Sequence, residues 1–596
     1  MTSPPLALVA AAASVARREG VAVRGPWTLG PTPRGEAWLL PLRLTLTAPP
    51  SAHVPAETAW VVAVSTAHTI IPRVRIYPAA IGPAVSSTFP HQSHNRPSER
   101  RHAVRGGDLC TRSSTHGLAA RRLVKTSEPR DLRDCVVWHV ARAQAWVEAA
   151  ALDRLARSGD PFELPDVQTS GRVDHGSLAF HEPLGGHSRW RSLPRAGLLR
   201  TTEIGPRGAR AVVALEWLDA DGVSVDAPPW GLHVSGLDDA DRALWIRLNR
   251  VPALNPWQAP RTGAELRDVM RGQGIDPRAL LAPLWRHVRG SRRPLLVVGF
   301  PIPDVVGGAD AVMQWQAVRL PAMPAEAPNT RLLRDGQDYA RAFGSRTLHW
   351  IPMSENWHPH VLQNRGRLPE PLASARVVVA GGGALGAPVA EALVRQGDGD
   401  LLLADPDRLE AGNLVRHSLS LVHLHQSKAV ALTDHLNATN PSARVRGVPV
   451  ALPSSRTDVQ QALASADLVL DLTASDNLLH AVPSLGLDPS TRVVSASLGL
   501  HAERLYLYAD DAGTFDPAAF DTWFAPHRAG EHAAAAREGL PQAAGCWHPV
   551  TPVPGHRIQT FVGLLLDALV ALAATKGPTF AVIEWPGLSV ARSHAA

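Results

Sequence analysis

A glycine-rich turn with a downstream carboxylate is the clearest chemical signal in this chain. Gly381-x-Gly383-x-x-Gly386 follows a β-branched run and precedes helix-like residues. Glycines let a backbone approach phosphate closely, and a helix N-terminus supplies amide donors. Asp405 lies 19 residues after Gly386, at the end of the next expected strand, where a carboxylate commonly binds ribose hydroxyls. The pattern predicts a nucleotide site.

Charged residues further along indicate which nucleotide the site uses. Arg416 and Lys428 follow the Asp405 turn, and Asp476 follows a later expected strand. Hydride transfer needs neither cations on a triphosphate nor a metal-binding carboxylate. Adenylation needs both, since phosphates must be neutralised and the departing pyrophosphate carries Mg²⁺. The set therefore favours ATP with Mg²⁺ over a nicotinamide cofactor.

Cys546 is a candidate nucleophile. It lies in Gly545-Cys546-Trp547-His548-Pro549, and a thiolate near histidine and arginine (His548, His556, Arg557) can have a lowered pKa. The preceding segment Arg528–Ala544 is rich in histidine, alanine and glycine, and we expect it to be mobile.

Cys110 is a second candidate for acyl transfer. It follows Gly107-Asp108-Leu109, and either His91 or Asn95 in the polar loop before it could stabilise an oxyanion during attack by an amine. The remaining cysteine, Cys135, stands among apolar residues of a helical segment, where a packing role is expected.

The expected elements place these residues in an α/β multidomain chain. Residues 1–165 combine strands with a helix at Asp134–Arg157, and residues 166–370 form a mixed α/β linker domain. In residues 371–596, helices alternate with strands, which predicts a doubly wound, mostly parallel sheet. The expected strands there are Arg376–Ala380, Asp400–Ala404, Asp467–Leu472 and Val493–Ser497.

Composition narrows the classes of protein. The 596 residues are 45% hydrophobic and 19% charged, which is ordinary for a folded globular chain. Three cysteines exclude a disulfide scaffold, and no CxxC pair offers a structural zinc site. No run of 18 apolar residues predicts a membrane span, so we expect a cytoplasmic protein. The net charge of +6 is spread along the chain and predicts no direct nucleic-acid binding.

The segment Arg376–Asn477 resembles the adenylation domain of the ThiF-type ubiquitin-activating superfamily, which has a Rossmann-like fold. The resemblance implies that Asp405 binds ribose and that Asp476 binds Mg²⁺. The implied phosphate ligands are Asn413, Arg416 and Lys428. Domains of this family pair as homodimers, and an upstream arginine often acts across the dimer; Arg365 and Arg367 are the candidates.

The chain departs from that family in three respects. His417 stands where glutamine is common, and the family's paired CxxC zinc site is missing. The loop before Asp476 also has one extra residue, Ala474 or Ser475.

The region around Cys110 resembles ubiquitin-conjugating enzymes, which carry Tyr-Pro after a strand, a His-Pro-Asn turn and a Gly-x-x-Cys segment. Here Tyr77-Pro78 is followed by Pro90-His91-Gln92-Ser93-His94-Asn95 and by Gly107-Asp108-Leu109-Cys110. With the activating-type region at the other end, the chain resembles the fused activating–conjugating proteins of bacterial CBASS antiphage operons.

That resemblance implies a reaction cycle. ATP adenylates the C-terminal carboxylate of a protein, Cys546 takes the acyl group as a thioester, Cys110 receives it, and a target amine attacks. The implied protein substrate is a cGAS-like nucleotidyltransferase. Two alternatives stay open: a ThiF- or MoeB-like adenylyltransferase for a sulfur carrier or peptide, and a binding scaffold with an inactive nucleotide fold.

Overall fold

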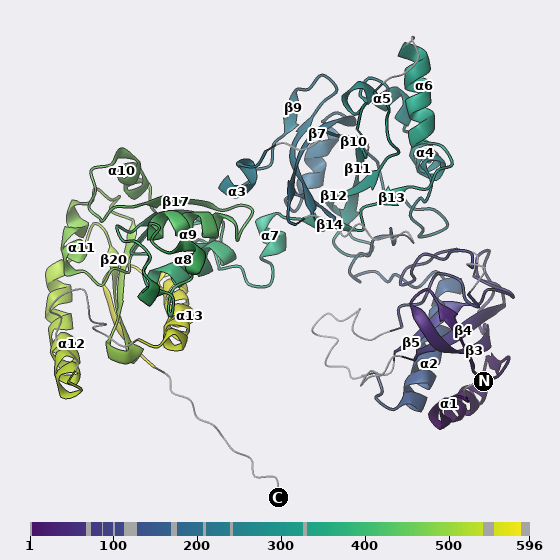
Figure 1. Ribbon diagram of the computed structural model, residues 1–596, viewed down its shortest axis with the longest axis horizontal. Helices are drawn as coiled ribbons and strands as arrows, with labels where there is room; N and C mark the ends of the chain where they lie inside the picture. Colours follow the sequence, from purple (N-terminus) through teal and green to yellow (C-terminus); the bar gives the residue numbers. More distant parts are fainter. Residues whose placement is uncertain are drawn as a thin grey trace, which may run out of the picture. The chain divides into compact units, whose positions relative to one another are not determined.

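The computed structural model describes residues 3–66, 73–85, 87–98, 102–111, 128–167, 176–206, 210–238, 242–291, 293–325, 331–539 and 553–585. They form two compact units, whose helices and strands are labelled in Figure 1. The first comprises residues 1–227 and 239–356, and the second comprises residues 228–238 and 357–596.

The N-terminal part of the first unit is an antiparallel sheet with two helices on one face. The sheet order is β1-β3-β4-β5, and β2 pairs with β3. Leu8 on α1 and Val140 on α2 share a core cluster with Leu42 and Val62 of the sheet. The elements are α1 Leu6–Ala16, β1 Val21–Val23, β2 Thr28–Thr32, β3 Gly35–Thr45, β4 Glu57–Ser65, β5 Val74–Pro78 and α2 Leu132–Ala151.

Helix α2 is shorter than the expected span Asp134–Arg157. It begins at the cap Asp131, whose side chain accepts a hydrogen bond from the Asp134 amide. It ends at Ala151, and Asp153 then has a left-handed φ of 54°, which a continuing helix does not allow.

The rest of the first unit is built on a mixed nine-stranded sheet of order β13-β12-β11-β10-β7-β8-β6-β14, with β9 paired to β8. This agrees with a mixed α/β linker region. Its strands are β6 Ser177–Phe180, β7 Ala196–Ile204, β8 Ala211–Leu218, β9 Ser224–Asp226, β10 Ala243–Arg247, β11 Leu295–Pro303, β12 Asp310–Arg319, β13 His349–Trp350 and β14 Met353–Asn356. Its helices are η3 Gly186–Arg191, α4 Gly263–Gly272, α5 Pro277–Leu281, η4 Trp285–His287 and α6 Arg331–Ala342.

The second unit contains a seven-stranded sheet of order β17-β16-β15-β18-β19-β20-β21. The first five strands run parallel, and β20 and β21 are antiparallel additions. The predicted doubly wound, mostly parallel sheet is therefore confirmed. The strands are β15 Val377–Ala380, β16 Asp400–Ala404, β17 Arg444–Val448, β18 Leu468–Asp471, β19 Arg492–Leu498, β20 Arg504–Asp511 and β21 Thr579–Glu584.

Helices cover both faces of this sheet, because its central strands are apolar on both sides. Along β15, Val377 and Val379 pack with α8, α9 and α13, whereas Val378 and Ala380 pack with α10, α11 and α12. The long helices are α8 Gly386–Gln396, α9 Lys428–Asn437, α10 Thr457–Ala464, α11 Asp476–Ala481, α12 Pro517–Arg537 and α13 Gly555–Leu572. The short ones are α3 Leu232–Ser235, α7 Pro359–Leu362, η5 Leu372–Ser374, η6 Ala411–Asn413, η7 Leu421–His423, η8 Val482–Ser484 and η9 Leu500–Ala502.

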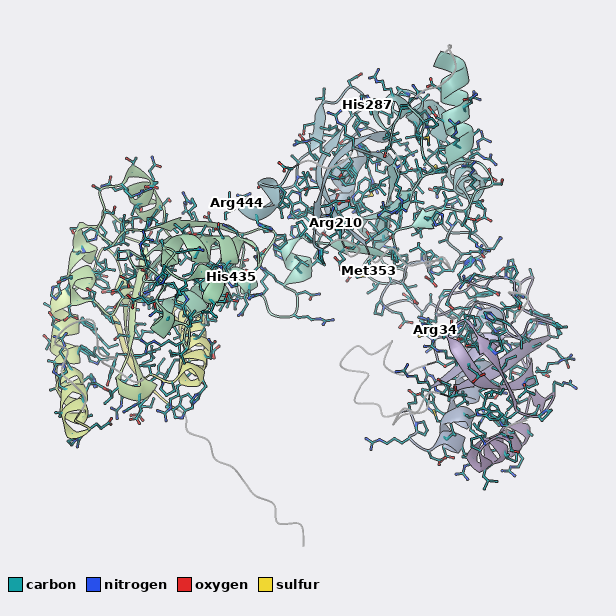
Figure 2. All side chains as sticks on the ribbon, in the orientation of Figure 1. Arg34, Arg210, His287, Met353, His435 and Arg444 are labelled. Atoms are coloured by element: carbon teal, nitrogen blue, oxygen red, sulfur yellow. The ribbon has the colours of Figure 1, made fainter. Side chains whose placement is uncertain are left out.

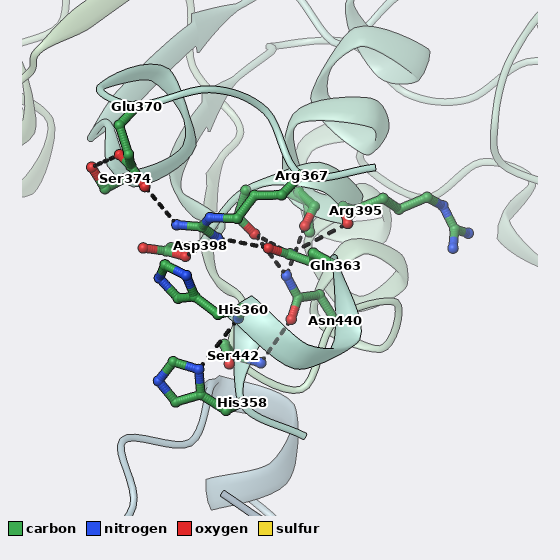
Figure 3. A network of polar contacts seen from close by, with 12 residues as sticks. His358, His360, Gln363, Arg367, Glu370, Ser374, Arg395, Asp398, Asn440 and Ser442 are labelled. Atoms are coloured by element: carbon green, nitrogen blue, oxygen red, sulfur yellow. Dashed lines mark hydrogen bonds and ion pairs between the residues drawn. The ribbon is translucent and has the colours of Figure 1, made fainter. Parts of the chain in front are cut away.

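Residues 357–370 belong to the second unit, although we expected the linker domain to extend to residue 370. Side chains in this segment bind the loop after α8 (Figure 3). Gln363 donates a hydrogen bond to the Gly397 carbonyl at 2.6 Å, and Arg367 contacts Asp398 at 2.7 Å. These polar contacts attach residues 357–370 to the second unit, so the boundary after the linker domain lies before residue 357. Sequence spacing does not reveal such contacts. The expected boundary at residue 165 stays a prediction.

A segment of the linker region also belongs to the second unit. The amides of Gly231 and Leu232 donate to the carbonyls of Pro441 and Ala443, at 2.7 and 2.8 Å. Arg444 at the start of β17, labelled in Figure 2, donates to the Pro229 carbonyl at 3.4 Å. These backbone contacts attach residues 228–238 beside β17.

Helix α13 has a length and apolar composition that would suffice to cross a membrane, which the sequence analysis did not anticipate. Its residues Ile558, Phe561, Leu565 and Leu569 are buried in the core cluster that includes β15 and β16. This packing is that of a core helix covering a sheet.

Candidate functional site

The glycine loop connects β15 to α8 at the carboxyl end of the central strand. Gly381 has a left-handed φ of 90°, and a Cβ on Gly386 would lie 1.8 Å from the Gly381 carbonyl oxygen. A Cβ on Gly381 would lie 2.9 Å from the Leu472 carbonyl at the end of β18. Both positions therefore require glycine. The loop lies at the point where the strand order of the sheet reverses, which is where parallel sheets of this kind usually bind their ligands.

Asp405 and His417 hold the middle of this loop. The buried Asp405 carboxylate accepts hydrogen bonds from the amides of Gly382 (2.7 Å) and Asp407 (2.8 Å). The His417 Nε2 lies 2.8 Å from the Gly382 carbonyl, and its Nδ1 accepts from the Leu419 amide. Burial lowers the pKa of His417, and a neutral ring protonated at Nε2 satisfies both partners. Gly382 is thus fixed through both its N–H and its C=O.

The predicted phosphate ligands follow on the next connection. Lys428 is the first residue of α9, nearly buried, and its Nζ lies 2.9 Å from the Asp407 carboxylate. Asn413 ends η6, where its side chain accepts from the Glu410 amide. Arg416 is half-buried three residues later. Asp407 pairs with Lys428 and donates its amide to Asp405, which accepts from the Gly382 amide. The turn after Asp405 therefore connects Lys428 to the glycine loop.

The predicted metal ligand lies at the carboxyl edge of β18. Asp476 begins α11, is exposed, and forms an ion pair with Arg528 of α12 at 3.0 Å. Nearby Asp471 is buried, and burial raises its pKa. Arg528 was not among the predicted site residues, because the pairing of α11 with α12 leaves no pattern in the sequence.

Cys110 lies at a cleft of about 1140 Å³ in the first unit. Its amide donates to the His91 carbonyl at 2.8 Å, and the neighbouring residues Gln92 and Leu109 form a β-bridge. His91, Cys110 and Trp146 all line the cleft. The structure therefore brings together the predicted cysteine and one of its two predicted oxyanion residues.

The two oxyanion candidates differ in what their side chains bind. Asn95 is buried, and its amide nitrogen donates to the carbonyls of Val85 (2.8 Å) and Ser87 (2.9 Å). Both hydrogens of the Asn95 side-chain amide are thus bonded to backbone carbonyls of the preceding loop. His91 forms an ion pair with Glu163 at 2.6 Å, and this hydrogen bond raises the pKa of His91. His91 is therefore the stronger candidate for a charged group beside Cys110.

The Cys546 prediction lies outside the described residues. We expected the segment Arg528–Ala544 to be mobile, and its first part, up to Arg537, forms the end of helix α12. Alanine has the highest helix propensity, and the run Ala533–Ala536 extends the helix.

The two upstream arginines differ in environment. Arg367 is largely buried and contacts Gln363, Asp398 and Glu370, as Figure 3 shows, whereas Arg365 is exposed. Arg367 thus anchors residues 357–370, and Arg365 is the better candidate to act outside its own unit.

Replacing these arginines should separate the two roles. Arg367→Ala removes three contacts and should destabilise the chain by about 1–3 kcal/mol, measured by urea unfolding. Arg365→Ala should leave the unfolding midpoint unchanged and lower ATP–pyrophosphate exchange by roughly 10²-fold, the typical effect of removing one transition-state donor. Full exchange in Arg365→Ala would exclude it from the reaction.

Two regions of the chain match known families. Residues 363–501 match the ThiF family, and residues 153–357 match the Cap2 central linker domain. The second unit therefore carries a ThiF-like adenylation fold.

Similar proteins extend these matches. The chain is 28% identical over 551 residues to the ATP-dependent ubiquitin transferase-like protein Cap2 of Enterobacter hormaechei subsp. hoffmannii, covering 90% of this chain and 89% of that protein. It is 40% identical over 109 residues to a sulfur carrier protein adenylyltransferase of Thermus thermophilus, covering 18% of this chain and 39% of that protein. The structure is also similar to a crystal structure of E. coli MccB with ATP. The match covers 36% of this chain and 64% of the MccB chain, at 14% sequence identity and a TM-score of 0.25.

Proposed function

We propose that this chain uses ATP to activate the C-terminal carboxylate of a protein and then transfers the acyl group to an amine. The observation that carries the proposal is the arrangement at the carboxyl edge of the parallel sheet. There the glycine loop is fixed by Asp405 and His417, and Lys428 reaches the adjoining turn.

The first step is adenylation. A carboxylate oxygen attacks the α-phosphorus of ATP, an acyl–AMP bond forms, and pyrophosphate leaves. Amides of the glycine loop and the start of α8 are placed to bind phosphate oxygens. Each Asp405 oxygen accepts one backbone hydrogen bond and retains a lone pair for a ribose hydroxyl. Arg416, Lys428 and Asn413 would hold the phosphates that depart.

The residues present fit a Mg²⁺ ion. Asp476 offers exposed carboxylate oxygens, the ligand type that Mg²⁺ prefers, and its partner is a surface arginine rather than a buried group. Bound there, the ion would neutralise charge on the pyrophosphate. An ion pair between exposed groups contributes at most about 1 kcal/mol, so Arg528 can release Asp476 at little cost.

Two thioester steps follow. The Cys546 thiolate displaces AMP from the adenylate, and the Cys110 thiolate then displaces Cys546 from the acyl carbon. An amine, commonly of a lysine, attacks that carbon, an amide forms and the Cys110 thiolate leaves. The cleft at Cys110 gives the acyl tail or amine access, and His91, whose pKa is raised by its hydrogen bond to Glu163, lines the same cleft.

The biological setting is also proposed. Similarity to an ATP-dependent ubiquitin transferase-like protein over nine-tenths of the chain supports a role in protein conjugation, and we propose that the chain is a fused activating–conjugating protein of a CBASS operon. We propose a cGAS-like nucleotidyltransferase as the activated protein, a homodimer formed through residues 371–596, and a cytoplasmic location.

A second candidate function is adenylation alone. It is favoured by the match to a sulfur carrier protein adenylyltransferase, which lies within the ThiF-like region. In that case Cys110→Ala would leave the product unchanged, whereas the first proposal requires Cys110 for conjugation.

Asp476→Ala should abolish formation of the acyl-adenylate while leaving the fold intact, because it removes an exposed carboxylate at the start of a helix. Pyrophosphate exchange with the cognate protein measures this step. Asp458→Ala is the matched control: Asp458 is also near the start of a helix in this unit and pairs with an arginine. Wild-type exchange in Asp476→Ala would remove Asp476 from the site.

A further inference from the structure

A buried cluster of three metal-binding side chains lies at the start of α2, apart from the sites described above. Cys135 and His139 are four residues apart on α2, so their side chains share one face of the helix, and both are fully buried. Glu128 precedes the helix cap and turns back across its first turn. The donor atoms of all three lie within 4.8 Å of one another.

We propose that Glu128, Cys135 and His139 bind a zinc ion. Sulfur, imidazole nitrogen and carboxylate oxygen are the ligand types that Zn²⁺ takes, with bonds of about 2.0–2.3 Å. A tetrahedral centre with such bonds separates its ligand atoms by roughly 3.3–3.6 Å. The Cys135 Sγ lies 3.7 Å from the Glu128 Oε1, and the His139 Nε2 lies 2.8 Å from it. Side-chain movements that open the His139–Glu128 contact and bring the Cys135 Sγ and the His139 Nε2, which lie within 4.8 Å of each other, to these separations would form the site.

The charges in the cluster also fit this ion. Zinc binding releases the Cys135 thiol proton to solvent, and the thiolate and carboxylate then balance the two positive charges of the ion. The buried centre thus has no net charge, which avoids the cost of burying an unpaired ion. Neutral His139 completes three protein ligands, and a water molecule supplies the fourth.

A further contact orients the imidazole. The His139 Nδ1 lies 2.6 Å from the Thr111 hydroxyl, so with Nε2 on the metal, Nδ1–H donates to that oxygen. Metal-binding histidines usually donate their other ring N–H in this way. Because Thr111 directly follows Cys110, the zinc centre would brace the backbone beside Cys110.

Metal analysis of the purified full-length chain tests the proposal without any assay of activity. We expect one zinc per chain, and in cobalt-loaded protein a thiolate-to-cobalt absorption band. Cys135→Ser and His139→Gln should lose both, whereas Cys110→Ser, the matched cysteine control, should keep both. Thr111→Val should weaken zinc binding by about 10- to 100-fold.

Stability measurements guard against a variant that simply fails to fold. After chelation, added zinc should raise the unfolding temperature of the wild type and of Cys110→Ser, but not of a folded Glu128→Gln variant. Zinc at trace levels in the wild type, or equal zinc affinity in Cys135→Ser, would overturn the proposal and leave a hydrogen-bonded cluster only.

Discussion

Lys428→Ala should lower ATP–pyrophosphate exchange by roughly 10²- to 10³-fold, the usual effect of removing one charged donor from a transition state. The Lys428 side chain is 9% exposed, and its ammonium is held 2.9 Å from Asp407, on the turn that begins at Asp405. We expect this cation to contact phosphates bound at the glycine loop, so its loss should affect the rate more than the fold.

The chain contains only three lysines, and one of the other two provides a matched control. Lys576→Ala removes an exposed lysine of the same unit and should leave exchange unchanged. Lys428→Arg keeps the charge and should retain part of the activity, since the guanidinium differs from the ammonium in shape. Equal exchange in Lys428→Ala and the wild type would show that Lys428 serves only its ion pair with Asp407.

The geometry of the glycine loop and of Asp405 was largely predictable because its sequence signals are local. A β-branched run, three glycines and a carboxylate at the next strand end all act within one strand–helix–strand unit. Gly381 and Gly386 are required by backbone geometry that their spacing already indicates. The sheet order then follows from alternating strands and helices.

The contacts that complete the site were not predictable from spacing. His417 was recognised as a departure from a family pattern, but its bond to the Gly382 carbonyl spans 35 residues and depends on the fold. Arg528 meets Asp476 only because α12 packs on the same face as α11. Asn95 is buried and binds the backbone of its own loop, whereas His91 lines the cleft at Cys110. Sequence spacing alone does not distinguish these two environments.

The two proposed thioesters should form in a fixed order, Cys546 first. The adenylation fold belongs to the second compact unit and Cys110 to the first, whereas Cys546 follows the adenylation region in the sequence. We therefore expect transfer to Cys110 to follow capture of the adenylate by Cys546. Cys110→Ala should then trap a reducible adduct on Cys546, and Cys546→Ala should give no adduct on either cysteine.

Non-reducing gels with ATP, Mg²⁺ and the cognate protein distinguish this relay from its alternatives. Asp476→Ala should show no adduct at all, since no adenylate forms, which separates failure of activation from failure of transfer. If Cys546→Ala still charges Cys110 at the wild-type rate, Cys110 takes the acyl group directly from the adenylate. If Cys110→Ala instead yields the complete product, the cleft at Cys110 has no part in conjugation and adenylation alone explains the chain.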